Sequence, residues 1–393
     1  MDDLRERLRE LPCGERLLAA AAGMSGVHLV GGAVRDLLLG RAPSELDVVV
    51  EGDIAPLAAR LGAGEEAVAH ERFATATVRV GECRWDLAGA RAETYTRPGA
   101  LPDVRAAATL EQDLLRRDIT INALALDLAD GTLRGAPHAE EDLAARRLRV
   151  LHDASFTDDP TRLWRVARYA ARLGFAIEER TARLAAEAVA GGAPGTVSGP
   201  RIGNELRLAL AEPDPVAALD AAVAIGAAPW LAPDRALTER ALALLPPGEG
   251  RRDLLVLAAA LPAPAAADER LARLELTAAE RAIVRASVAA PALAEGAPAS
   301  ELARALRDLP VEAVALAGAR GAPAPARRWL DDLRHVALQI TGADLLAAGI
   351  AEGPEVGRRL QAVLDLRLDG ALAAGRAAEL AAALAAAPGA GTS

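Results

Sequence analysis

Two acidic residues, Glu45 and Asp47, stand two positions apart at the start of an apolar, β-branched run over residues 46–50. Residues i and i+2 of a strand point to one face of a sheet, so both carboxylates are expected on the same side. A third acid, Asp86, lies between apolar neighbours in another predicted strand, where an unpaired carboxylate would be costly. Acids converging from two strands are suited to hold two Mg²⁺ ions. The alternative for Asp86 is that it caps its strand or pairs with a nearby arginine.

Paired glycines, Gly31 and Gly32, separate a predicted strand at 27–30 from a predicted helix at 33–39. Glycine lets the backbone pass close to a ligand, and the helix N-terminus that follows favours phosphate through its free N–H groups. Acids beside a phosphate site repel it unless a divalent cation lies between them. A glycine turn or an acid pair alone is usually structural, but the combination predicts metal-assisted nucleotidyl transfer.

The segment LVGGAVRDLLLGRAPSELD, residues 29–47, resembles the class II tRNA nucleotidyltransferases (CCA-adding enzymes) and their bacterial poly(A) polymerase relatives, members of the DNA polymerase β superfamily. Their pattern G-G-x-V-R-D-x-L-L-G followed by D-x-D is matched by Gly31, Gly32, Val34, Arg35, Asp36, Leu38, Leu39, Gly40 and Asp47. Glu45 departs from the pattern, where aspartate is usual, and its carboxylate reaches about 1.5 Å further. The resemblance implies that Glu45, Asp47 and Asp86 are catalytic metal ligands. It also implies that Gly31, Gly32 and Arg35 cradle a triphosphate.

A second block, DLLRRDITINALAL at 113–126, resembles the family motif R-R-D-F-T-I-N-A, with isoleucine in place of the aromatic residue. In the family this motif holds the sugar and phosphates of the nucleotide. The resemblance therefore implies that Arg116, Arg117, Asp118 and Asn122 bind nucleotide. The chemistry agrees, because an arginine guanidinium can donate two parallel hydrogen bonds to phosphate oxygens, and Asp or Asn can bond ribose hydroxyls. Without the resemblance, Arg-Arg-Asp would be a solvated salt-bridge cluster.

A third block, SFTDDPTRLWRVARYAARLGF at 155–175, predicts a helix capped by Thr157. Asp159 and Arg162 are three apart and are expected on one helical face, where they offer an acceptor beside a donor. Cytosine and adenine present an amino donor next to a ring-nitrogen acceptor, whereas guanine and uracil present the reverse. One such pair could therefore accept CTP and ATP and refuse GTP and UTP. The block also resembles the family motif E-D-x-x-R, with Asp158 in place of glutamate.

Arginines continue along this helix at helical spacing. Arg165 is assigned to the nucleotide, and Arg168 and Arg172 are assigned to RNA. Segment 161–207 holds eight arginines against four glutamates, a local basic stripe in a chain whose net charge is −10. A capped helix with an internal salt bridge would explain the first turn equally well, but not this stripe. Because the net charge is negative, strong non-specific binding of nucleic acid is not expected.

The rest of the composition excludes several classes of protein. All 45 basic residues among the 393 are arginine, so every cationic contact to phosphate must come from arginine. Cys13 and Cys83 are too few for a disulfide framework or a metal site, and we expect them to be ordinary reduced residues. No sufficiently long apolar run occurs outside alanine-rich helical stretches, and the charged N-terminus does not resemble a signal peptide. We expect a cytoplasmic protein with no membrane association and no protein partner.

Short strand patterns alternate with helices up to about residue 135, and alanine- and leucine-rich helices follow. The resulting prediction is an α+β fold: a mixed five-strand nucleotidyltransferase head at 1–140, a helical neck at 141–210 that selects the base, and a helical body and tail at 211–393. By resemblance, the body and tail bind tRNA. The turn-prone segment between Asp86 and Asp113 has the position of a mobile loop of the family, and its local form is similar to the A-adding, long-loop branch.

The function expected from the resemblance is template-independent addition of CMP and AMP to the tRNA 3′ end from CTP and ATP, with two Mg²⁺ ions and release of pyrophosphate. Poly(A) polymerases share the same motifs, and an enzyme that adds only CC or only the final A would also share them. A different class of protein also stays open, in which Glu45 has disabled the metal site and the chain only binds RNA.

Overall fold

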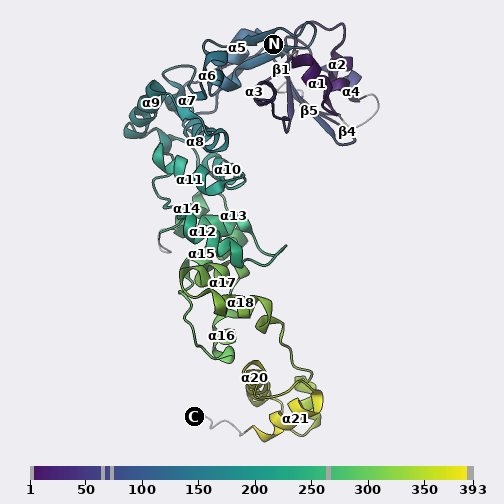
Figure 1. The fold of residues 1–393 in the computed structure, drawn as a ribbon, viewed down its shortest axis with the longest axis vertical. Coiled ribbons are helices and arrows are strands. Elements are labelled where there is room, and N and C mark those ends of the chain that lie inside the picture. The colour runs from purple at the N-terminus through teal and green to yellow at the C-terminus, as the bar shows by residue number, and fades with distance from the viewer. Residues whose placement is uncertain (1–3, 63–66, 71–74, 263–266, 387–393) are drawn as a thin grey trace. The chain divides into compact units, whose positions relative to one another are not determined.

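The computed structural model describes residues 4–62, 67–70, 75–262 and 267–386. The chain forms two compact units, residues 1–229 and 230–393 (Figure 1). Both of the divisions expected from the sequence, after residues 140 and 210, fall inside the first unit.

The first unit is built on a mixed sheet. Its strands are β1 (Val27–Val30), β2 (Leu46–Val50), β3 (Ala67–His70), β4 (Thr75–Val80), β5 (Cys83–Gly89), β8 (Leu124–Asp127) and β9 (Leu133–Gly135). They form one seven-stranded sheet in the order β3-β4-β5-β2-β1-β8-β9. Two strand pairs lie outside it: β6 (Arg91–Thr94) with β7 (Asp103–Ala106), and β10 (Arg147–Leu148) with β11 (Ala176–Ile177).

Helices surround this sheet and then continue beyond it. The helices are α1 (Leu4–Arg9), α2 (Gly14–Ala21), α3 (Gly32–Leu38), α4 (Ala55–Gly62), α5 (Leu110–Leu115), α6 (Ala139–Ala144), α7 (Ser155–Asp158), α8 (Thr161–Leu173), α9 (Glu179–Ala190), α10 (Gly199–Leu210) and α11 (Pro215–Ala224), with 3₁₀ turns η2 (Thr120–Asn122) and η3 (Ala193–Thr196).

The predicted fold class is confirmed, since a mixed sheet is followed by helices. The sheet has seven strands where five were expected, because short edge strands such as β9 carry too few residues to show an alternating pattern. The segment between Asp86 and Asp113, read as turn-prone, contains the β6–β7 hairpin. Small strands β10 and β11 also interrupt the region expected to be purely helical.

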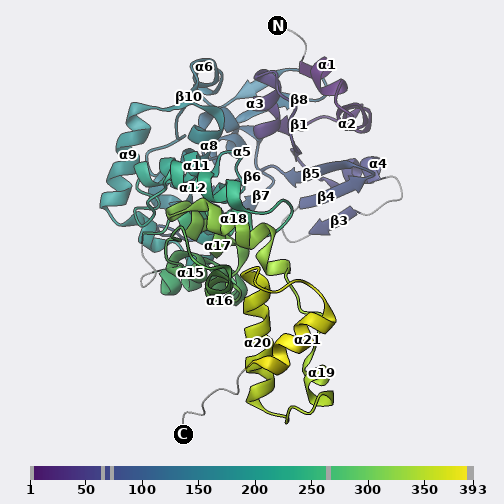
Figure 2. The same cartoon turned by 60° about the horizontal axis from the view of Figure 1, so that its bottom comes forward.

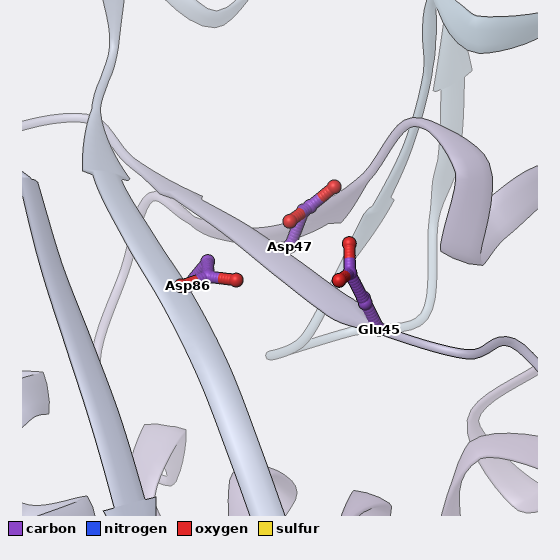
Figure 3. A group of neighbouring side chains, drawn as sticks. All are labelled: Glu45, Asp47 and Asp86. Atoms are coloured by element: carbon purple, nitrogen blue, oxygen red, sulfur yellow. The ribbon is translucent and has the colours of Figure 1, made fainter. Parts of the chain in front are cut away.

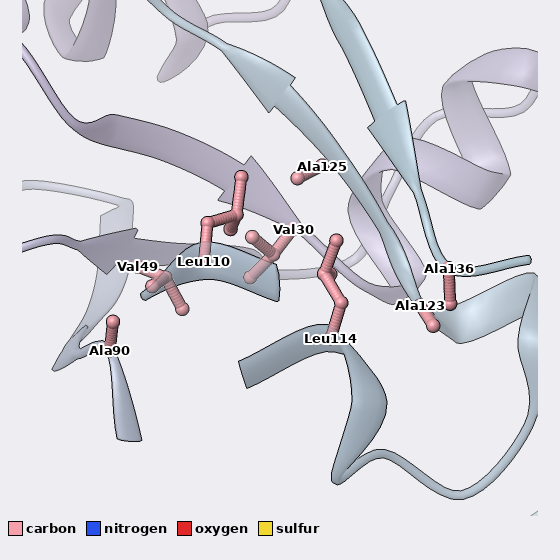
Figure 4. Packing of buried hydrophobic residues seen from close by; sticks show 8 residues of the cluster. All are labelled: Val30, Val49, Ala90, Leu110, Leu114, Ala123, Ala125 and Ala136. Atoms are coloured by element: carbon pink, nitrogen blue, oxygen red, sulfur yellow. The ribbon is translucent and has the colours of Figure 1, made fainter. Parts of the chain in front are cut away.

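Strand register decides where the acids of the sheet lie. Strands β2 and β5 run parallel, and Asp47 is directly opposite Asp86. On the same face, Leu110 and Leu114 of α5 pack over Val30 and Val49 (Figure 4). Helix α5 therefore covers part of the face that carries the acids, and its C-terminal end delivers the following residues to that face.

The prediction of two unpaired cysteines is wrong. Cys13, which precedes α2, and Cys83, which begins β5, form a disulfide across 70 residues of sequence. In the chain-entropy model, a loop of this length corresponds to about 4 kcal/mol of stabilisation. Next to the bridge, the indole Nε1 of Trp85 donates to the carbonyl oxygen of Cys13 at 3.2 Å. Sequence spacing carries no information about this proximity, which arises because the N-terminal helices pack against the sheet.

The described part of the second unit is helical. Its elements are α12 (Arg235–Leu244), α13 (Arg252–Ala259), α14 (Ala267–Arg273), α15 (Ala278–Ala289), α16 (Ala299–Leu306), α17 (Val311–Arg320), α18 (Pro323–Asp331), η4 (Leu333–His335), α19 (Gly342–Ala347), α20 (Pro354–Leu368) and α21 (Arg376–Ala385). Helices α19, α20 and α21 pack together around Leu345, Val363 and Ala383 (Figure 2). Within the described ranges, no helix combines the length and apolar character needed to cross a bilayer.

Candidate active site

Three carboxylates lie close together where strand β2 begins, beside strand β5. Glu45 precedes β2, Asp47 lies on it, and Asp86 lies on β5, with their carboxyl groups turned toward one another (Figure 3). One oxygen from each lies within 4.8 Å of the other two. The structure therefore brings together the three residues predicted as metal ligands, including Glu45 with its longer side chain.

The electrostatics of this acidic triad (Glu45, Asp47 and Asp86) suit a divalent cation. Burial raises the pKa of Asp47, and repulsion from Glu45 and Asp86 raises it further, outweighing the nearby arginines. Arg84 places a guanidinium nitrogen 2.8 Å from Asp86 Oδ2 and another 3.8 Å from Glu45 Oε1. Oxygen ligands from several carboxylates are the donor set that Mg²⁺ prefers, so these residues fit that ion.

A cavity of about 720 Å³ opens beside the triad. Its wall includes most of the predicted site residues: Gly31, Gly32, Asp47, Asp86, Arg116, Arg117, Asp118, Asn122, Asp159, Arg162 and Arg165. Gly31 has a φ of 70°, and a Cβ atom at this position would lie only 2.7 Å from Nη1 of Arg117. The backbone conformation therefore favours glycine at this position, and a Cβ atom would also displace the end of the Arg117 side chain.

Asp113 organises the two arginines that follow α5. It is fully buried, and its Oδ1 accepts from Nε and Nη2 of Arg116 at 2.9 and 2.7 Å. Its Oδ2 accepts from Nη2 of Arg117 at 2.9 Å. Burial raises the pKa of Asp113, but the attraction of Arg117 and Arg116 outweighs this, and the pKa lies below its usual value. Both guanidinium groups are thus fixed in the cavity wall by one carboxylate.

We expect Asp113→Asn to loosen both arginines. Removing the charge should lower the free energy of unfolding by about 3 kcal/mol at neutral pH and raise KM for nucleotide about tenfold. Because the pKa of Asp113 is lowered in the folded state, its ionised carboxylate stabilises the fold above about pH 4, and this contribution is lost as the pH falls through the folded pKa. Thermal unfolding from about pH 7 to about pH 3 should show the difference between variant and wild type disappearing in acid.

Glu111→Gln, a change of an exposed acid in the same helix, is the matched control and should leave both quantities unchanged. Equal melting temperatures of Asp113→Asn and wild type at neutral pH would contradict this role for Asp113.

A chain of hydrogen bonds through the cavity wall connects helix α3 to helix α8. Arg35 is only 3% exposed, and its Nη1 donates to Oδ1 of Asn122 at 2.6 Å. Asn122 Nδ2 donates to Asp118 at 3.2 Å, and Nε of Arg165 donates to Asp118 Oδ2 at 2.7 Å. Burial raises the pKa of Asp118, but Arg165 and the hydrogen bonds outweigh it and lower the pKa. Arg35 therefore supports Asn122, and its assignment to the triphosphate stays a prediction.

The third sequence block, residues 155–175, differs from the expected single helix. Helix α7 ends at Asp158 and α8 begins at Thr161, so Thr157 is not an N-cap. Asp159 lies between the helices in an extended conformation, and its Oδ1 accepts from the backbone N–H and hydroxyl of Thr161 at 3.0 and 2.7 Å. Nη2 of Arg201 donates to the same oxygen at 2.7 Å. Among the described residues, no hydrogen bond involves Oδ2, which leaves an acceptor for a ligand.

Arg168 and Arg172 are engaged within the protein. Arg168 is 5% exposed and donates to Glu205 and Glu212 at 2.9 and 3.1 Å. Arg172 donates to both oxygens of Glu212 at 2.7 and 2.6 Å. These ion pairs join α8 to α10 and to Glu212, two residues beyond its end, and they engage two of the eight arginines of the basic stripe. The assignment of Arg168 and Arg172 to RNA stays a prediction.

Several cavity residues were missed by the sequence interpretation. They are Thr77, Arg91, Glu93, Tyr95, Thr161, Tyr169 and Glu205. Tyr169 follows Arg165 by four residues, so helical spacing could have found it. Its ring lies under the guanidinium carbons of Arg35, Arg165 and Arg172 at 5.3, 5.9 and 5.7 Å. Glu205 lies on another helix, and the sequence offers no local signal for its proximity.

A mixed sheet that carries three acids beside a glycine turn and an arginine-lined cavity defines a nucleotidyltransferase head. Residues 27–149 match the family model described as poly A polymerase head domain. The chain is 38% identical to the CC-adding tRNA nucleotidyltransferase of Deinococcus radiodurans, with 88% of this chain and 85% of that protein covered. The chain belongs to the tRNA nucleotidyltransferase family.

Another relative is the A-adding tRNA nucleotidyltransferase of Geobacter sulfurreducens, 33% identical over 88% of this chain and 44% of that protein. The chain spans less than half the length of this enzyme and of the A-adding relatives from Halalkalibacterium halodurans and Aquifex aeolicus.

Solved structures of CCA-adding enzymes resemble nearly the whole chain. An apo form has a TM-score of 0.82 at 27% identity, with 98% of this chain and 96% of that chain covered. The Thermotoga maritima enzyme in complex with tRNA has a TM-score of 0.75 at 26% identity, with 98% of each chain covered. Complexes with ATP and with CTP have TM-scores of 0.78 and 0.77 at 27% and 28% identity, covering 94% and 93% of this chain and 94% of each of those chains.

Proposed function

We propose that the protein adds CMP and AMP to the 3′ end of tRNA from CTP and ATP, without a nucleic-acid template, and releases pyrophosphate. The observation that carries this proposal is one cavity whose wall holds two acids of the triad together with Asp159 and Arg162. The related enzymes solved with ATP, CTP and tRNA support this choice of substrates.

Each part of the cavity has a role in this reaction. Arg116 and Arg117, fixed by Asp113, bind phosphate oxygens of the nucleotide. Asp159 Oδ2 accepts from the amino group of cytosine or adenine, and Arg162 donates to the adjacent ring nitrogen. The proposal thus assigns one pair of side chains to both cytosine and adenine. Guanine and uracil are refused, because the donor and acceptor on their pairing edges are reversed.

The acidic triad completes the site by holding Mg²⁺. When bound there, Mg²⁺ lowers the pKa of the attacking hydroxyl and stabilises the leaving pyrophosphate. The protein's own contribution is to hold the three carboxylates close together despite their mutual repulsion. They lie at the edge of the cavity that receives the nucleotide.

The decisive experiment supplies labelled CTP or ATP, with Mg²⁺, to tRNAs that lack one, two or three terminal nucleotides. We expect two C additions and then one A on the tRNA that lacks all three. Extended ATP incorporation on unrelated RNA would instead indicate a poly(A) polymerase. Binding of tRNA without any Mg²⁺-dependent incorporation would contradict the proposal and indicate a protein that only binds RNA.

A narrower enzyme is the second candidate, because relatives covering 88% of this chain include both an A-adding and a CC-adding enzyme. The same tRNA series separates these outcomes. An A-adding enzyme extends only tRNA that ends in CC, and a CC-adding enzyme stops after two nucleotides.

A further inference from the structure

Arg162 is held in the cavity wall by three neutral acceptors. Its Nη1 donates to Oγ of Ser155 at 2.8 Å and lies 3.2 Å from Nε2 of His152. Its Nη2 donates to the carbonyl oxygen of Arg116 at 2.8 Å. A guanidinium has only donors, so Nε2 of His152 must be the acceptor, and the ring must be neutral with its proton on Nδ1. The orientation of Arg162 therefore depends on the protonation state of His152.

Charged groups approach His152 from several elements. Arg162 approaches from α8, and Asp158 at the end of α7 places Oδ2 4.0 Å from Nδ1. A second cavity of about 280 Å³ beside the ring is lined by the charged residues Arg149, Asp153, Glu178 and Arg180 and by a second titratable histidine, His138. Asp153 is paired with Arg180 at 2.6 Å. Burial lowers the pKa of His152 and Arg162 lowers it further, outweighing Asp158 and Asp153, so the neutral form is favoured.

We propose that His152 is a positioning residue for base selection, because its neutral ring accepts a hydrogen bond from Arg162 and so orients the guanidinium toward a base with a ring-nitrogen acceptor beside an amino group. The inference rests on the proposed function, in which Arg162 reads the base. His152 itself does not touch the nucleotide, since it lies behind Arg162 and is absent from the wall of the 720 Å³ cavity.

Protonation removes this support. A protonated ring has no acceptor at Nε2 and places a second positive charge 3.2 Å from Nη1 of Arg162. The arrangement is therefore present above the pKa of His152 and is lost as the pH falls through it, in the range below about 6.5. Discrimination between CTP and UTP should fall over the same range.

The test measures kcat/KM for CTP and for UTP (or for ATP and GTP, if the enzyme adds only A) at several values from about pH 8 to about pH 5.5. The ratio of the two values cancels effects common to both nucleotides, such as metal binding and deprotonation of the tRNA hydroxyl. The variants are His152→Ala, which removes the acceptor, and His152→Gln, which offers an acceptor that does not titrate. His335→Gln, at an exposed histidine in the second unit, is the control.

In the wild type and the His335→Gln control, we expect the ratio to fall toward acid pH and to approach about a tenfold loss only below the lowered pKa of His152. In His152→Gln it should stay high and independent of pH, and in His152→Ala it should be about tenfold lower at neutral pH, mainly through KM for the correct nucleotide. Melting temperatures identify a variant that fails to fold, and the pH profile of His152→Gln then decides alone.

A His152→Ala ratio equal to that of wild type at neutral pH, or an acid fall in wild type that persists unchanged in His152→Gln, would overturn the role of His152. Failure of the wild type to add any nucleotide to any truncated tRNA would instead overturn the proposed function. The two failures are therefore distinguishable.

Discussion

Replacing Asp47 by alanine should lower kcat for nucleotide addition at least about a thousandfold and leave the protein folded. Asp47 is the central member of the acidic triad, opposite Asp86 on the neighbouring strand and two residues from Glu45. Its pKa is raised by burial and by these two neighbours, which means that the ionised carboxylate opposes folding. Removing it should therefore keep or raise the melting temperature, because such acids are retained for function at the expense of stability.

The measurement is single-turnover addition of labelled nucleotide to truncated tRNA, together with thermal unfolding. Glu82→Ala, a change of an exposed acid in the turn between β4 and β5, is the matched control and should retain activity. Activity of Asp47→Ala within about tenfold of wild type would rule out the metal-ligand assignment.

The second large effect is expected at Asp159. In Asp159→Asn, the amide oxygen can keep the bonds that Oδ1 makes with Thr161 and Arg201, and the new amino group then occupies the position of Oδ2. A donor would face the amino group of cytosine or adenine where an acceptor now lies. We expect kcat/KM for CTP and ATP to fall about a hundredfold, since a mismatched buried polar contact is strongly penalised.

For UTP and GTP, kcat/KM should fall less, because their carbonyl oxygen accepts a hydrogen bond from the new amino group. Arg162 still places a donor against their ring N–H, so these nucleotides remain poor substrates. The selectivity for CTP over UTP should therefore narrow. Asp103→Asn removes the same charge from an exposed position on β7 and should leave selectivity unchanged. Unaltered selectivity in Asp159→Asn would show that this side chain does not read the base.

Local pattern was sufficient to predict the centre of the site. A strand, two glycines and a helix were expected around residues 27–39, and β1, Gly31 and α3 occupy that stretch. Strand alternation predicted that Glu45 and Asp47 share one face, and both lie near Asp86, although Glu45 precedes β2. Asp86 was expected as an acid without a partner, but it is paired with Arg84 and accepts from Thr77, so the stated alternative also holds. All three inferences depend on neighbours within a few residues, where physical rules act directly on sequence.

The supporting contacts could not be predicted, because their partners are distant in the sequence. Arg201 and Asp159 are 42 residues apart, and Arg168 and Glu212 are 44 apart. Arg35 and Asn122 are separated by 87 residues. Arg35 and Arg168 are candidate ligands of phosphate or RNA in the sequence, and only the folded chain shows which acceptor binds each of them. The predictions for Arg35, Arg168 and Arg172 left these internal partners out for this common reason.

All lysine and arginine side chains in the wall of the 720 Å³ cavity are arginine, and this determines how the protein can be labelled chemically. Arg91, Arg116, Arg117, Arg162 and Arg165 supply its positive charge, and the sequence contains no lysine. Amine-directed reagents therefore have no target side chain there, whereas dicarbonyl compounds condense with guanidinium groups. Footprinting with such a compound, in the presence and absence of CTP or ATP, would map which of these five side chains the bound substrate shields.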